Sequence, residues 1–62
     1  MRRAADYHPG ERFSSPSGVW TVTGTGRTVA GMVSLTAKLD RDDRDEWFVF
    51  HPDHLLRGEV AS

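Results

Sequence analysis

The clearest pattern in the sequence is an alternation of apolar and polar positions from Thr28 to Leu39. Apolar or small residues occupy the odd positions, and small or polar residues occupy the even ones, with Met32 as the exception. A period of two predicts a β-strand, in which successive side chains point to opposite faces of a sheet. Gly31 and several β-branched residues disfavour a helix. We therefore predict a strand over 28–39, with a kink at Gly31 of the kind that small barrels need.

Four shorter β-prone runs lie on either side of this segment, separated by clusters of Gly, Pro, Ser and Asp that are typical of turns. Residues 24–26, Gly-Thr-Gly, predict a turn or bulge, and the charged residues 40–46 predict a solvated hairpin loop. Pro52 to Leu56 predicts a single helical turn, because Pro is favoured at the first helical position with an acid next to it. The predicted strands cover residues 11–14, 19–23, 28–39, 47–51 and 57–60.

Together these elements predict an all-β fold, a small barrel of about five short antiparallel strands. Residues 1–9 have no periodicity and mixed charge, so we expect a flexible N-terminal arm, followed by a single small β-barrel domain over residues 10–62. A chain of this size must collect its large apolar side chains into one core. The candidates are Phe13, Val19, Trp20, Val22, Val29, Met32, Val33, Leu35, Leu39, Trp47, Phe48, Val49, Phe50, Leu55, Leu56 and Val60.

The strand over 47–51 is apolar on both faces. Phe48 and Phe50 share one face, and we place them in the core because two aromatic rings two residues apart fill a small barrel well. Trp47 and Val49 then point the other way. They are covered either by the N-terminal arm or the 13–18 loop, or by a partner, since aromatic residues are enriched at the centres of protein interfaces. A homodimer is one such partner.

Composition excludes several classes of protein. The chain has 62 residues, no cysteine and a net charge of -1. It contains no apolar run of about 18 residues and no secretory signal pattern, so we expect a cytoplasmic protein without a membrane partner. Without cysteine there is neither a disulfide framework nor a thiolate zinc site. Arg outnumbers Lys, and the residues Asn, Gln and Ile are absent. This composition is typical of GC-rich codons and indicates a bacterial or phage origin.

The sequence offers little catalytic chemistry. His51, Asp53 and His54 are ligand types for zinc, but they straddle a strand end and a turn, where hydrogen bonds to the backbone are the alternative reading. Serines occur without a nucleophile signature. Residues 24–28 lack the Lys-Ser/Thr ending and the following helix of a phosphate-binding loop. We therefore expect no enzyme, with no catalytic, cofactor-binding or metal-binding residues.

A resemblance to a known family adds a second reading. The stretch Gly18-Val19-Trp20-Thr21-Val22, Gly24-Thr25-Gly26 and Val29-Ala30-Gly31-Met32-Val33 resembles the strand–Gly loop–strand pattern of KOW domains and related SH3-like barrels. Residues 50–55, Phe-His-Pro-Asp-His-Leu, resemble the strand-then-turn ending of SH3-like barrels. The resemblance implies an SH3-like barrel. It also implies contacts with RNA or with the transcription and translation machinery.

Two functions from different classes follow. The first is a non-enzymatic binding or adaptor module that makes protein–protein contacts. The alternative is a small barrel that binds RNA or DNA in the KOW manner, using exposed aromatic rings beside basic side chains. The candidate binding residues for the two functions are Trp47, Val49, Arg27, Lys38, Arg41 and Arg44.

Overall fold

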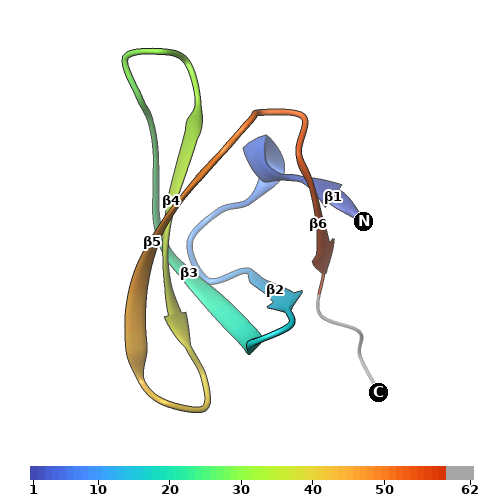
Figure 1. Cartoon of the computed structure of the whole chain (residues 1–62), viewed down its shortest axis with the longest axis vertical. Helices are drawn as coiled ribbons and strands as arrows, with labels where there is room; N and C mark the ends of the chain where they lie inside the picture. The colour runs from blue at the N-terminus through green and yellow to red at the C-terminus, as the bar shows by residue number, and fades with distance from the viewer. Residues whose placement is uncertain (59–62) are drawn as a thin grey trace.

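The computed structural model describes residues 1–58, which form one antiparallel sheet with the strand order β1-β6-β2-β3-β4-β5. Figure 1 shows the strands and a short 3-10 helix, η1, near the N-terminus. The all-β prediction is confirmed. The elements are β1 (Arg2–Arg3), η1 (Ala4–Asp6), β2 (Arg12–Ser15), β3 (Gly18–Arg27), β4 (Val33–Leu39), β5 (Arg44–Phe50) and β6 (Leu55–Gly58).

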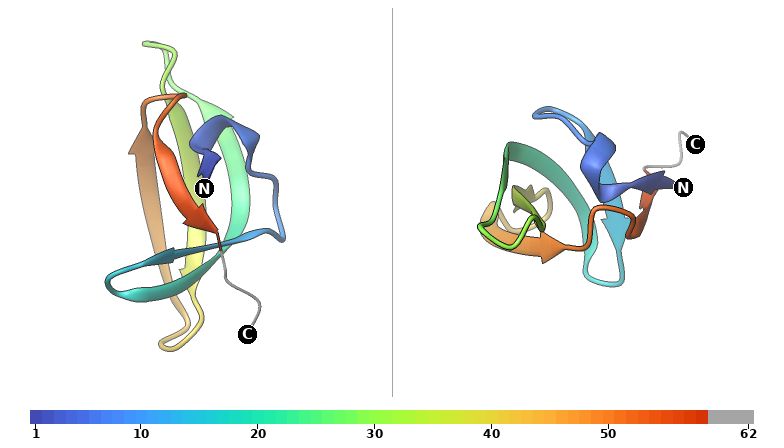
Figure 2. Two further views of the ribbon diagram at one scale, coloured as in Figure 1. Left: turned by 90° about the vertical axis from the view of Figure 1, so that its right-hand side faces the viewer. Right: turned by 90° about the horizontal axis from the view of Figure 1, so that it is seen from above.

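The sheet is strongly curved but not closed. Strands β2 to β5 follow one another as a meander, and β6 returns to pair with β2 on one side and β1 on the other. The two views in Figure 2 show the strands wrapping round the interior of the molecule. Strands β1 and β5 end the sheet, and within residues 1–58 they do not pair with each other. The closure of the sheet into a barrel stays a prediction.

The long strand predicted over 28–39 is wrong in its first part. β4 begins only at Val33, and residues 28–32 form the loop of the β3–β4 hairpin. Thr28 closes this loop, because its backbone N–H donates to the carbonyl oxygen of Met32 (2.9 Å) and its Oγ1 accepts from the Met32 N–H (3.1 Å). Gly31 has a φ of 85°, where glycine is favoured. Turn chemistry at these two residues outweighs the alternation around them.

The Gly-Thr-Gly stretch over 24–26 lies inside β3 and does not end it. The register between β3 and β4 shifts between Val22 and Gly24, just before this stretch, and residues 24–26 pair regularly with β4, so the turn alternative is wrong. A Cβ on Gly24 would lie 2.8 Å from Oγ1 of Thr36 on β4. A side chain at this position would require the Thr36 hydroxyl to move away from Thr23 Oγ1, and glycine avoids this conflict.

The single helical turn predicted near 52–56 is also wrong. Residues 52–53 form a turn and β6 begins at Leu55. The turn is closed by the backbone N–H of His54, which donates to the carbonyl oxygen of His51 (2.9 Å). A strand forms next because β6 pairs with a neighbour on each side, which gives its backbone groups more partners than one helical turn could.

The core lies on the concave side of the sheet and is organised around aromatic rings. Phe48 packs edge-on against Phe13 (centroids 5.6 Å apart) and Trp20 (4.9 Å), and it stacks on Phe50 (5.8 Å). The indole N–H of Trp20 donates to Ser15 Oγ (2.9 Å), so its polar group is satisfied. The buried apolar residues are Ala4, Tyr7, Phe13, Trp20, Val22, Val33, Leu35, Ala37, Leu39 and Leu56.

The expected N-terminal arm packs against the sheet in the structure. Ala4 and Tyr7 are buried, and the Tyr7 ring lies edge-on to Phe13 with centroids 5.8 Å apart. The backbone N–H of Ala4 donates to the carbonyl oxygen of His54 (2.8 Å), and β1 pairs with β6. The Arg2 guanidinium covers the Tyr7 ring at 4.7 Å. Residues 1–8 therefore contribute to the domain that was expected to begin at residue 10.

Some of the candidate core residues lie elsewhere. Val29 is fully exposed in the β3–β4 loop, because the segment expected to be strand is a loop. Leu55 is exposed at the start of β6, and Trp47 and Val49 are exposed on β5. The strand predicted over 57–60 is observed two residues earlier as β6, and Val60 lies outside the described residues.

Two ion pairs tie distant parts of the sheet together and predict acid sensitivity. Glu11 accepts from Arg2 (2.5 Å) and from the His8 backbone N–H (2.8 Å), and these contacts lower the pKa of the Glu11 carboxyl. Asp40 accepts from Thr21 Oγ1 (2.9 Å) and from Arg12, and these contacts lower its pKa as well.

A carboxyl whose pKa is lower in the folded chain stabilises the fold above its unfolded pKa, and the contribution is lost as pH falls through the folded value. We expect the free energy of unfolding to fall between about pH 5 and pH 2. Glu11→Gln and Asp40→Asn should each flatten this decline in urea melts measured across that range. Asp45→Asn is the control, because the Asp45 carboxylate makes no hydrogen bond or ion pair with residues 1–58. Equal slopes in all four proteins would contradict this account.

Candidate functional site

The outward face of β5 carries two exposed apolar side chains, Trp47 and Val49. β5 lies at the end of the sheet, and within residues 1–58 it pairs with β4 alone, where Trp47 is opposite Thr36 and Val49 is opposite Ser34. Trp47 is 65% exposed and Val49 is 43% exposed. Their neighbours Phe48 and Phe50 are half-buried against the core. The predicted division of this strand between an inward and an outward face is confirmed.

A shallow depression of about 510 Å³ lies beside the Trp47 ring. Its floor is polar, because Thr23 Oγ1 donates to the carbonyl oxygen of Thr36 (3.1 Å) and lies 3.2 Å from its hydroxyl. Its wall is charged and includes Lys38 as well as two carboxylates. The lining residues are Thr23, Thr36, Lys38, Asp45, Glu46 and Trp47.

Three of the basic residues that the sequence predicts to bind a partner form ion pairs with carboxylates. Lys38 Nζ lies 3.3 Å from Asp43, and Arg44 lies 2.8 Å from Glu46. Arg41, in the β4–β5 turn, has its Nε 3.8 Å from Asp42. These exposed pairs add little to stability, but each places a negative charge beside a positive one. The surface around Trp47 is therefore mixed in charge and not a basic patch.

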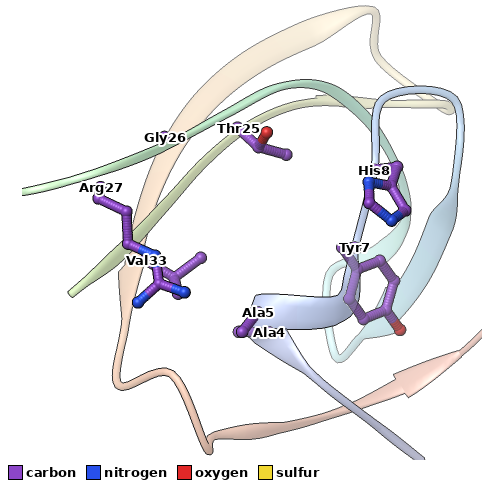
Figure 3. A pocket seen from close by; sticks show the side chains of 8 residues that line it. All are labelled: Ala4, Ala5, Tyr7, His8, Thr25, Gly26, Arg27 and Val33. Carbon is purple, nitrogen blue, oxygen red and sulfur yellow. The ribbon is translucent and has the colours of Figure 1, made fainter. Parts of the chain in front are cut away.

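Arg27 lies in a different place from the other predicted binding residues. It stands at the end of β3, beside a cleft of about 180 Å³ between η1 and the β3–β4 hairpin, which Figure 3 shows with His8 on its far side. Arg27 Nη1 donates to the Gly31 carbonyl oxygen (3.4 Å) in the adjacent loop. The structure brings together Trp47, Val49 and Lys38, with Arg44 next to them, and leaves Arg27 apart.

The histidines of the 51–54 turn have structural contacts. His51 Nδ1 accepts the backbone N–H of Asp53 (3.2 Å), and the His54 ring stacks on Phe50 with centroids 5.0 Å apart. Within residues 1–58, no group of three or more His, Asp or Glu side chains is placed to hold a metal ion. The same residues include no helix with the length and apolar character to span a membrane.

Sequence reasoning missed the polar members of the surface. The charge pattern of the sequence predicts a loop at Asp45 and Glu46, but these residues are part of β5, where Asp45 is opposite Lys38 and Glu46 is opposite Ala37. A pattern in the sequence indicates the outward face. Polar residues occupy the even positions of β4, Ser34, Thr36 and Lys38, and the β5 residues opposite them must lie on the same face of the sheet.

Comparisons with known proteins were made with protein-family models, with curated proteins and with solved structures, and none of these matches the chain.

Proposed function

We propose that this chain is a non-enzymatic binding module that contacts proteins through the outward face of β5. The observation that carries the proposal is the exposure of Trp47, at 65%, beside Val49 on a strand at the end of the sheet. Aromatic side chains are enriched at the centres of protein interfaces and often supply much of their binding energy. As expected from the composition, the module would act in the cytoplasm of a bacterium or in the course of phage infection.

The charges around Trp47 favour a protein over a nucleic acid. Lys38 and Arg44 are each paired with a carboxylate, and Asp45 adds a further negative charge to the same depression. A nucleic-acid surface gains most of its affinity from cations that can neutralise phosphates, and neighbouring carboxylates oppose this. A protein surface with its own mixed charges fits this pattern better.

Val49→Lys tests the proposal, with Val29→Lys as its matched control. Both valines are exposed, at 43% and 110%, so each change should alter stability by no more than about 0.5 kcal/mol. Immobilised wild-type chain and the Val29→Lys control should retain the same proteins from an extract of the source cells. Val49→Lys should lose them, because a charge would be buried without a partner at the contact.

A parallel titration with labelled RNA and DNA, at roughly 50 and 200 mM salt, tests the alternative function. We expect weak binding that differs little between Val49→Lys and Val29→Lys, because each variant adds one positive charge. Tight nucleic-acid binding with a steep salt dependence would favour the KOW-like alternative. Equal protein retention by Val49→Lys and wild type would contradict the proposed contact surface.

A further inference from the structure

The edge of β5 that faces away from β4 has no partner strand within residues 1–58. Strands at the ends of sheets often avoid pairing by being short or bulged, or by carrying Pro or charged residues. β1, at the other end, has two residues, whereas β5 has seven. β5 contains no Pro, its charged residues are confined to Arg44, Asp45 and Glu46 at its start, and its register with β4 runs without a shift from Arg44 to Phe50. Alternate N–H and C=O groups along β5 therefore point away from β4 and are available to another strand.

The outward residues of β5 form a pattern that is complementary to itself. Along the strand and one step beyond it, every second residue reads Asp45, Trp47, Val49 and His51. The order is acid, apolar, apolar and imidazole. When a second copy runs antiparallel beside the first, the acid at one end meets the imidazole of the other copy, and the two apolar residues meet in the middle.

The position of the two-fold axis decides whether this match occurs. Residues directly opposite each other in an antiparallel pair have their side chains on the same side of the sheet. The two-fold axis must therefore pass midway between the two copies of one residue. With the axis at Phe48, Trp47 faces Val49 of the second copy and Asp45 faces His51. With the axis at Trp47, Asp45 would face Val49 of the second copy.

The two remaining central registers are worse because they place like charges together. With the axis at Val49, Asp45 would face Asp53 of the second copy. With the axis at Glu46, each Glu46 would face its own counterpart. Like charges directly opposite each other destabilise a strand pair. Of these four registers, only the one centred on Phe48 places Trp47 opposite Val49 and Asp45 opposite a base on the outward face, while Glu46 faces Phe50 on the inward face.

We infer that the chain forms a symmetric dimer in which β5 pairs antiparallel with β5 of a second copy, with the two-fold axis at Phe48. This inference rests on the proposed function, since it names the partner of the same surface. Each Trp47 packs on Val49 of the other copy, as aromatic and β-branched residues do in cross-strand pairs. The two Asp45–His51 contacts lie on either side of this apolar centre.

The contacts of His51 in the single chain prepare it for this role. Its Nδ1 accepts the Asp53 backbone N–H, so in the neutral imidazole the proton is on Nε2, which can donate outward. The carboxylate of Asp45, the acceptor in the other copy, makes no hydrogen bond or ion pair with residues 1–58. Within the described residues, the His51 Nε2 donor and the Asp45 acceptor therefore have no other partner.

Sedimentation velocity over a range of concentrations tests the dimer and its register. The wild-type chain and Val29→Lys should change from the mass of one chain to that of two as the concentration rises. His51→Asp places two carboxylates opposite each other and should weaken the dimer about tenfold or more. The double variant Asp45→His/His51→Asp exchanges the two partners. It should restore the dimer to within about threefold of wild type, given the tolerance of cross-strand pairs to exchange.

Circular dichroism of each variant establishes that it is folded. An aspartate at position 51 can still accept the Asp53 N–H, so we expect His51→Asp to keep the turn. If it does not fold, Asp45→Arg provides the unpaired single variant, and it should weaken the dimer as well. A wild-type chain that stays monomeric at every concentration overturns the inference, as does a folded double variant that remains as weak as the single one. If the chain is monomeric but protein retention still depends on Val49, the proposed function stands with another partner.

Discussion

Phe13→Ala is expected to leave the chain largely unfolded. The Phe13 side chain is 1% exposed, and its ring packs edge-on against Tyr7 from the N-terminal segment and Phe48 from β5. Phe13 thus connects the N-terminal segment to β5 through the core. Truncating a buried phenylalanine costs about 3–5 kcal/mol. A domain of 62 residues has a total stability of roughly 3–9 kcal/mol, so most of the free energy of unfolding would be lost.

Urea melts followed by circular dichroism measure this effect. Phe13→Leu is the matched control, because it keeps most of the apolar volume and should cost less than about 1.5 kcal/mol. A Phe13→Ala variant that melts within about 1 kcal/mol of wild type would mean that Phe13 is not at the centre of the core.

A chain that begins at Gly10 is also expected to lose most of its folded population. The truncation removes Ala4 and Tyr7, both buried, and the pairing of β1 with β6. It also uncovers Phe13 and removes the hydrogen bond from Ala4 to His54. Loss of the Tyr7 ring alone should cost about 3 kcal/mol or more, by comparison with other large aromatic side chains. The pattern of the sequence predicts the opposite, a truncated chain that still folds.

Circular dichroism and a thermal melt of the truncated chain distinguish these expectations. Tyr7→Phe in the full chain is the control, since it keeps the ring and removes a hydroxyl that has no hydrogen-bond partner within residues 1–58. That variant should be as stable as wild type or more so, because a buried polar group without a partner is costly. A truncated chain with a wild-type melt would show that residues 1–9 are the arm that the sequence pattern predicts.

The sequence was most informative where alternation coincides with pairing in the sheet. The alternation of residues alone predicts that Phe48 and Phe50 point inward and that Trp47 and Val49 point outward. The pairing of β5 with β4 keeps this alternation along the whole strand. The strand predicted from alternation is wrong in residues 28–32, because Val29 and Gly31 continue the alternating pattern inside a loop. The hydrogen bonds of Thr28 decide that structure, and no hydrophobic pattern reports them.

The N-terminal segment could not be recognised from its pattern because it is held by very few buried side chains. Ala4 and Tyr7 are three residues apart on a 3-10 turn, which is too short to show a period. The 52–56 segment failed for a related reason: local preferences favour a helical turn there, but pairing with two neighbouring strands depends on residues far away in the sequence. In the candidate site, Trp47 and Lys38 were found from the sequence, whereas the distant position of Arg27 depends on the β3–β4 hairpin.

The central claim is that β5 uses its inward face for folding and its outward face for contact. A comparison of the unfolding free energies of Phe48→Ala and Trp47→Ala tests this claim most directly, because the two residues are neighbours of similar chemistry. Phe48 packs on Phe13 and Trp20, so its truncation should cost about 3 kcal/mol. Trp47 is 65% exposed, so its truncation should cost about 1 kcal/mol or less. If Trp47→Ala is instead the more destabilising change, the Trp47 ring belongs to the fold, and the outward face of β5 is not a contact surface.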